Sequence, residues 1–125
     1  MASILIVEDR AVVIADLEMA LKGHRLFVAE TGAAAQILFE RHQAVIDIAL
    51  LDGYLDPQDP VKNTLEFIKY MRASGFKKPM VAISGDTRMC IRQQEVGCSH
   101  QVVKHPTDKA YLDKIVQLVN ELTAK

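Results

Sequence analysis

The chain has 125 residues and a formal net charge of −1, and half of its residues are hydrophobic. This length fits a single filled core, so we expect one domain over residues 1–125. A nearly neutral chain without a basic run is not typical of nucleic-acid-binding proteins, and no apolar stretch is long enough to span a membrane. Two cysteines, Cys90 and Cys98, are too few for a disulfide framework and are interpreted as reduced, partly buried thiols. The apolar start at residues 4–7 lacks a basic leader, which argues against a signal peptide and predicts a cytoplasmic protein.

Short apolar runs of strand length alternate with segments whose apolar residues recur at helical spacing. The predicted strands cover residues 3–7, 26–29, 46–52, 80–84 and 101–104. The predicted helices cover residues 10–22, 32–43, 61–73 and 87–96, with a last helix from about residue 108 onward. Thr31 is the expected N-cap of the second helix. Two prolines and several polar turn formers predict a loop over residues 53–60.

Five strands alternating with five helices are typical of a parallel sheet that is covered by helices on both faces. We predict an α/β fold with a five-stranded, doubly wound sheet in the order 2-1-3-4-5, a flavodoxin-like (βα)5 three-layer sandwich. In this order the direction of winding reverses between the first and third strands. Ligands of such sheets bind at the carboxyl ends of the strands, beside this switch point.

Polar side chains follow the carboxyl ends of four of the five predicted strands. They are Glu8 and Asp9, Asp52, Ser84, and Lys104. Three carboxylates that meet at one crevice would repel one another unless a cation lay among them, and Mg²⁺ is a hard cation with such ligands. The Ser84 hydroxyl and the Lys104 ammonium are suited to binding phosphoryl oxygens. Asp52 is then the candidate nucleophile, because a carboxylate can form an acyl phosphate when nearby cations offset the charge.

In their order and spacing these residues resemble the receiver domain of two-component response regulators, and the resemblance covers essentially the whole chain. The run Ile4-Leu5-Ile6-Val7-Glu8-Asp9 is a particularly close match. The resemblance implies a Mg²⁺ site and an aspartate that takes a phosphoryl group from a histidine of a partner kinase. The implied metal ligands are Glu8, Asp9, Asp52 and the main-chain carbonyl of Tyr54. Asp52 would be the acceptor, Ser84 would bind a phosphoryl oxygen, and Lys104 would pair with the phosphoryl group.

Three positions depart from the family pattern, and all three concern transmission of the signal. Gln101 stands where the family usually has an aromatic switch residue, three positions before the lysine. His105 displaces the usual proline, which follows as Pro106. The proline that is common four residues after the acceptor is shifted by one position, since Asp56 stands there.

The leading hypothesis is a stand-alone phosphoreceiver whose only expected catalysis is its own phosphorylation and dephosphorylation. The chain ends at Lys125, directly after the last helix, so we expect signalling through protein contacts and no separate output domain. The expected partners are a sensor histidine kinase or a histidine phosphotransfer protein, and a downstream target on the face of the fourth helix, fifth strand and fifth helix. No nucleic-acid or membrane partner is expected, and the chain is expected to be a monomer or a weak dimer.

Two other functional classes share features of this sequence. A pseudo-receiver would keep the fold as a phosphorylation-independent binding module; Gln101 and the Lys104-His105-Pro106 loop favour it, and the intact acids oppose it. An aspartate-nucleophile phosphatase is set aside, because Tyr54 occupies the position where those enzymes usually have a second aspartate.

Six further side chains, four of them histidines, have expected places or roles. His24, His42 and His100 do not cluster in the sequence and are interpreted as surface residues, as is His105, which adjoins Lys104 and is expected to adjust the charge of the site near neutral pH. Gln101 is expected on the exposed end of an edge strand, as a partner-surface residue. The bulk of Tyr54 is predicted to restrict access to Asp52 and to lengthen the lifetime of a phosphoryl group there.

Overall fold

A computed structural model describes residues 1–55 and 63–124 of the chain, and these residues form strands and helices in strict alternation. The strands are β1 (Ser3–Val7), β2 (Arg25–Ala29), β3 (Ile48–Asp52), β4 (Met80–Ser84) and β5 (His100–Val103). The helices are α1 (Ala11–Ala20), α2 (Gly32–His42), α3 (Leu65–Ala73), α4 (Thr87–Val96) and α5 (Ala110–Thr123). The predicted loop at residues 56–60, the proline shift at Asp56 and the predicted helix start at residue 61 lie outside the described residues.

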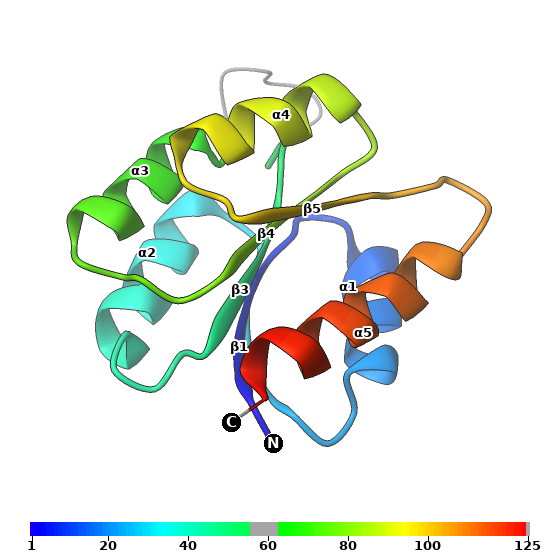
Figure 1. Cartoon of the computed structure of the whole chain (residues 1–125), viewed down its shortest axis with the longest axis horizontal. Helices are drawn as coiled ribbons and strands as arrows, with labels where there is room; N and C mark the ends of the chain where they lie inside the picture. Colours follow the sequence, from blue (N-terminus) through cyan, green and yellow to red (C-terminus); the bar gives the residue numbers. More distant parts are fainter. Residues whose placement is uncertain (56–62, 125) are drawn as a thin grey trace.

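The five strands form one sheet in the order β2-β1-β3-β4-β5, and every adjacent pair is parallel. This confirms the predicted fold class and strand order. All residues of β1, β3 and β4 are buried, as expected of strands that are covered on both faces. Figure 1 shows the helices on the two sides of the sheet, with α1 and α5 on one face and α2, α3 and α4 on the other.

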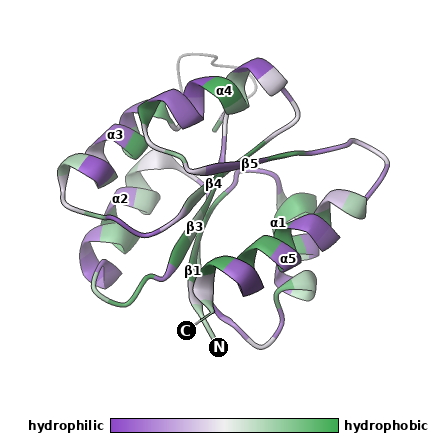
Figure 2. Ribbon diagram, viewed as in Figure 1, coloured by the Kyte–Doolittle hydropathy of each residue, from purple (hydrophilic) through white to green (hydrophobic). Residues whose placement is uncertain are grey.

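The sheet separates two hydrophobic cores, and Figure 2 shows that the apolar parts of the helices lie toward it. On the α2–α3–α4 face, the fully buried ring of Phe39 lies edge-on to three aromatic rings. Its ring centroid is 6.1 Å from that of Phe67, 5.9 Å from that of Tyr70 and 5.5 Å from that of Phe76. On the α1–α5 face, residues such as Leu17, Ile115 and Val119 pack against the aliphatic side chains of β1, β3 and β4. These two cores hold the strand tips in fixed relative positions.

Several predicted boundaries were wrong by one or two residues. The helix predicted from residue 61 was further off: it begins at Leu65, and the described residues Asn63 and Thr64 before it are not helical. The third strand begins at Ile48 rather than residue 46, because the Asp47 carboxylate accepts a hydrogen bond of 2.8 Å from the Ser3 backbone N–H instead of continuing the strand. The last helix begins at Ala110, because the His105 ring nitrogen Nδ1 accepts hydrogen bonds from two backbone N–H groups of the preceding turn. The Thr31 cap is confirmed: its hydroxyl accepts a hydrogen bond of 3.1 Å from the Ala34 N–H.

Three of the four histidines, His24, His42 and His100, are half-buried, so they are less exposed than the interpretation as surface residues suggested, and His105 is exposed. His24 Nδ1 accepts a hydrogen bond of 3.0 Å from the Ala2 N–H, and the His42 ring stacks on Phe27 with centroids 4.2 Å apart. His100 lies at the start of β5 and is also half-buried. The His24 and His42 contacts join residues that are distant in the sequence, so sequence spacing gives no sign of them.

Gln101 is half-buried in β5, and its Oε1 atom is buried without a hydrogen-bond partner among the described residues. The expectation of an exposed strand end was therefore wrong. Val102 packs in the core on the α1–α5 face, and because successive strand residues point to opposite faces, Gln101 points toward the face that α4 covers. Its burial follows from this helix.

Both cysteines lie in the core on the α2–α3–α4 face and are free thiols. They are more deeply buried than expected, since Cys90 is inaccessible and Cys98 is nearly so. Burial raises the pKa of the Cys90 thiol and raises the pKa of the Cys98 thiol to about 12, so both are protonated and unreactive at neutral pH. Within the described part of the chain, no helix combines the length and apolarity that crossing a membrane would need.

Helix α4 packs directly on the turn that follows β3, and this contact requires a glycine. A Cβ atom on Gly53 would overlap Met89 Cγ from α4 and would lie 3.1 Å from Ser84 Oγ. The absent side chain lets the helix approach the turn that carries Asp52. The packing of α4 and the geometry of this turn are therefore linked.

We predict that Gly53→Ala lowers the free energy of unfolding by about 1–3 kcal/mol, because the added methyl group forces Met89 or the turn to move. Urea denaturation followed by circular dichroism measures this change. The matched control is Gly85→Ala, where the nearest atom to the new Cβ is Lys104 O at 3.9 Å. The control should change stability by less than about 0.5 kcal/mol, and equal losses in the two variants would contradict the packing argument.

Candidate functional site

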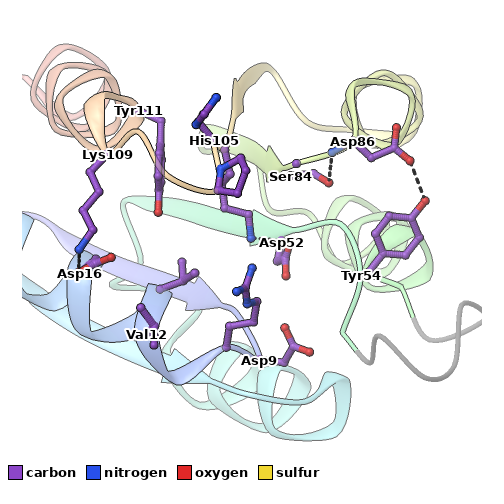
Figure 3. A pocket seen from close by; sticks show the side chains of 15 residues that line it. Asp9, Val12, Asp16, Asp52, Tyr54, Ser84, Asp86, His105, Lys109 and Tyr111 are labelled. Carbon is purple, nitrogen blue, oxygen red and sulfur yellow. Dashed lines mark hydrogen bonds and ion pairs between the residues drawn. The ribbon is translucent and has the colours of Figure 1, made fainter.

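The carboxyl ends of the strands border a pocket of about 500 Å³. Figure 3 shows that its lining comes from the tips of β1, β3 and β4, the segment after β5, and the first turns of α1 and α5. Asp9, Asp52, Ser84 and Lys104 line this pocket, and Glu8 is buried beside them within ion-pair distance of Lys104. The structure thus brings together the five side chains that the sequence placed at strand ends.

Lys104 links two of the three carboxylates. Its Nζ atom is 2.9 Å from Glu8 Oε2 and 3.1 Å from Asp52 Oδ1, and its side chain is only 11% exposed. Its backbone N–H donates a hydrogen bond of 2.9 Å to the Ser84 carbonyl, which anchors the residue directly after β5. Burial alone would lower the pKa of Lys104, but Asp52 and Glu8 outweigh it and raise that pKa above its ordinary value. Lys104 is therefore a fixed positive charge.

One oxygen from each of Glu8, Asp9 and Asp52 lies within 4.8 Å of the others. Lys104 contacts Glu8 and Asp52, whereas Asp9 has no cationic partner within ion-pair distance among residues 1–55 and 63–124. Burial and the neighbouring Glu8 raise the pKa of the Asp9 carboxyl. Three ionised carboxylates beside one ammonium carry an excess charge that a divalent cation with oxygen ligands would balance. The cluster fits such a cation and suggests a divalent-metal site.

The Asp52 carboxylate is held on one side only. Its Oδ1 atom accepts hydrogen bonds from the Gly53 N–H at 2.8 Å and from Lys104 Nζ at 3.1 Å. Its Oδ2 atom has no hydrogen-bond partner within the described part of the chain. Burial raises the pKa of Asp52 to about 7; Lys104 opposes this rise, and Glu8 adds to it. The result is an oriented carboxylate with one hydrogen-bonded oxygen and one oxygen that has no partner among the described residues.

The side chain of Tyr54 connects the turn after β3 to the start of α4. Its hydroxyl donates a hydrogen bond of 3.1 Å to Asp86 Oδ2, which Figure 3 shows at the edge of the pocket. Asp86 is the N-cap of α4, and its backbone N–H donates a hydrogen bond of 3.1 Å to Ser84 Oγ. The hydrogen bond from Tyr54 lowers the pKa of the Asp86 carboxyl. Ser84 is thus almost inaccessible and oriented by this connection.

Tyr54 was considered from the sequence for its carbonyl and its bulk, but its hydrogen bond to Asp86 was missed, as was the hydrogen bond from the buried Gln93 side chain to the Asp52 carbonyl. Asp86 precedes a helix, so a capping pattern could have identified it. Gln93 is completely buried, and its position four residues after Met89 on an inward-facing stripe was the available signal. Of the remaining candidates, His105 lines the pocket and is exposed, and Gln101 is not among the lining residues.

No family model matches the sequence, and no curated protein matches it either. Solved structures do match. The Mn²⁺-bound form of the response regulator Rcp1 is 18% identical with a TM-score of 0.79, and the match covers 100% of this chain and 96% of that chain. The phosphorylated cyanobacterial phytochrome response regulator RcpA is 18% identical with a TM-score of 0.80, covering 98% and 93%. The chemotaxis protein CheY4 of Vibrio cholerae is 24% identical with a TM-score of 0.76, covering 95% and 98%.

These structures are response regulator receiver domains, and they match over nearly the whole chain. Their low sequence identity means that the likeness concerns the fold. The chain has the flavodoxin-like α/β fold of response regulator receiver domains, including the CheY-like single-domain proteins.

We predict that the metal-free protein loses stability on the order of 2 kcal/mol between about pH 5.5 and about pH 8 through Asp52. The pKa of Asp52 is raised to about 7 in the folded chain, so the folded state keeps a proton that the unfolded chain releases above about pH 4. Stability therefore falls as the pH rises toward about 7. Chemical denaturation over this range, compared between wild type and Asp52→Asn, measures the effect. An Asp52→Asn protein with the same pH dependence as wild type would contradict the assignment.

Proposed function

We propose that this chain, as a single domain over residues 1–125, is the phosphoacceptor receiver of a two-component phosphorelay. Asp52 would take a phosphoryl group from a phosphohistidine of a sensor histidine kinase or a histidine phosphotransfer protein. The observation that carries the proposal is the pairing of an oriented, half-engaged Asp52 carboxylate with Lys104, next to the Glu8–Asp9 acids. The receiver-domain fold supports it.

In this function the free Oδ2 atom of Asp52 attacks the phosphorus atom and forms the O–P bond. The P–N bond to the donor imidazole breaks, and its electron pair stays on the imidazole nitrogen, which takes up a proton. Lys104 and the Ser84 hydroxyl bind phosphoryl oxygens as charge develops on them. Asp52 has to be ionised to attack, and Lys104 favours that form against the effect of burial.

Glu8, Asp9 and Asp52, with the main-chain carbonyl of Tyr54, would hold Mg²⁺ in this function. Once bound, Mg²⁺ would offset the negative charge that the carboxylates and the phosphoryl group bring together. The lack of any cationic partner for Asp9 among the described residues supports this role.

The phosphorylated chain would signal by binding a downstream protein through the α4–β5–α5 face. Exposed apolar side chains on this face, Ile91 on α4 and Val103 on β5, support its use as a docking surface. We propose that the exchange takes place in the cytoplasm, in line with the free, unreactive thiols of Cys90 and Cys98. A monomer or weak dimer would suffice.

We predict that the wild-type chain, incubated with Mg²⁺ and acetyl phosphate, gains the mass of one phosphoryl group in a base-labile form. Asp52→Asn should gain none, because an amide oxygen is not a nucleophile for phosphorus. Asp16→Asn is the matched control, since Asp16 lines the pocket rim and pairs with Lys109 at 3.2 Å, away from the acid cluster. Intact-protein mass spectrometry reads the result. An unmodified wild type, or modification that persists in Asp52→Asn, would refute the proposal and leave the binding-module alternative.

The Tyr54 side chain is predicted to slow hydrolysis of the phosphorylated site by limiting the access of water. Tyr54→Asn should shorten the phosphoryl lifetime by a factor on the order of three or more. Tyr54→Phe keeps the ring but loses the hydrogen bond to Asp86. It therefore distinguishes the effect of the size of the ring from the effect of the hydrogen bond that holds it. The decay of the phosphorylated mass after removal of the donor measures both. An unchanged lifetime in Tyr54→Asn would reject this role.

A further inference from the structure

Gln93 is a polar residue on the buried face of α4. The whole residue is inaccessible to solvent, like Met89 and Cys90 on the same helix. A buried carboxamide is costly unless its donors and acceptor are hydrogen-bonded, so an apolar residue would be the ordinary choice at this position. The contacts of Gln93 show what the amide does there.

The side-chain nitrogen of Gln93 faces the tip of β3. Nε2 lies 3.0 Å from the Leu51 carbonyl oxygen, 3.2 Å from the Asp52 carbonyl oxygen and 3.1 Å from Thr64 Oγ1. Because carbonyl oxygens only accept hydrogen bonds, this orientation of the amide is fixed. The other end, Oε1, is buried without a partner among the described residues. The amide is thus retained for its donors, although its acceptor is left unsatisfied.

The Asp52 carbonyl and the Gly53 N–H belong to the same planar peptide group. Its carbonyl accepts from Gln93 Nε2, while its N–H donates to Asp52 Oδ1 at 2.8 Å. Any rotation of this peptide would move the N–H away from the carboxylate. A hydrogen bond to the carbonyl also polarises the peptide and strengthens its N–H as a donor. Gln93 therefore acts on the Asp52 carboxylate through one peptide group.

We propose that Gln93 is a positioning residue for Asp52: it clamps the Asp52–Gly53 peptide and thereby orients the acceptor carboxylate. The same contact joins α4 to this peptide, beside the packing of Met89 on Gly53. Through this contact, the position of α4 and the direction of the Asp52 side chain are coupled. A displacement of α4 would turn the side chain, and a change in the direction of the side chain would displace α4. The orienting contact stands on the geometry alone; its value for phosphoryl transfer rests on the function proposed above.

The competing explanation is that Gln93 only supports the start of α3. Thr64 precedes α3, is completely buried, and accepts from the same nitrogen. Thr64→Val removes that acceptor and leaves both carbonyl contacts in place. It therefore perturbs the same buried network without touching the Asp52–Gly53 peptide, and it is the matched control.

The test compares wild type, Gln93→Met and Thr64→Val by NMR hydrogen exchange on the metal-free full chain. Met has a similar length to Gln but no donor. We expect exchange of the Gly53 amide to accelerate by about tenfold or more in Gln93→Met and by less than about twofold in Thr64→Val. The amide of Leu17, in the core on the other face of the sheet, reports global opening and should not follow Gly53. Equal acceleration in both variants, or an unchanged Gly53 in Gln93→Met, overturns the proposal.

Phosphorylation by acetyl phosphate at saturating Mg²⁺ supplies the second readout. Gln93→Met should lower the maximal rate by about tenfold with little change in the half-saturating concentration of acetyl phosphate, while Thr64→Val stays within about twofold. An unchanged maximal rate in Gln93→Met overturns the role in transfer. If wild type takes up no phosphoryl group, the proposed function fails, and exchange at Gly53 still decides whether Gln93 positions Asp52.

If Gln93→Met does not fold, NMR measurements on the wild type test whether Gln93 contacts the Asp52 carbonyl. A scalar coupling across the hydrogen bond between Gln93 Nε2 and the Asp52 carbonyl carbon supports the clamp. Side-chain amide protons of Gln93 that exchange as fast as those of the exposed Gln94 overturn it.

Discussion

The arrangement of the strand ends depends on the positive charge of Lys104, which two buried carboxylates share. The Lys104 ammonium contacts Glu8 and Asp52, which are 96 and 52 residues away in the sequence, and both carboxylates are nearly inaccessible. Two buried carboxylates side by side would be strongly unfavourable without this cation. The parallel sheet makes the contact possible, because it brings the ends of β1, β3 and β5 to one edge. The order and burial of the strands therefore determine which charged side chains meet at the site. The negative charge that Lys104 does not balance makes the cluster suitable for a divalent cation.

The features that depend on the regular alternation of strands and helices were predictable from the sequence. Strand-length apolar runs alternating with helical stripes gave the fold class, and the rule that parallel strands end at one edge placed Glu8, Asp52 and Lys104 together. The Thr31 cap followed from local chemistry. Helix and strand ends were less accurate, because side chains such as Asp47 hydrogen-bond to distant backbone groups and so compete with the extension of an element.

Contacts that depend on how closely two elements approach were not predictable. Gln93 reaches the Asp52 carbonyl only because Gly53 lets α4 lie against the turn after β3. The Tyr54–Asp86 hydrogen bond likewise depends on the distance between two turns, and no spacing rule relates these residues. Gln101 is similar: alternation along β5 fixes its direction, but its burial depends on α4. All of these contacts involve α4, so this helix connects the Asp52 carboxylate to the surface proposed for partner binding.

We expect the excess negative charge of Glu8, Asp9 and Asp52 to bind a divalent cation beside Lys104. Calorimetric titration of the chain with Mg²⁺ and with Mn²⁺ measures this binding. We predict one saturable site per chain, with affinity at least about tenfold lower in Asp9→Asn and unchanged in Asp16→Asn, whose carboxylate lies at the pocket rim. The absence of saturable binding, or equal affinity in wild type and Asp9→Asn, would contradict a divalent-cation site at these carboxylates.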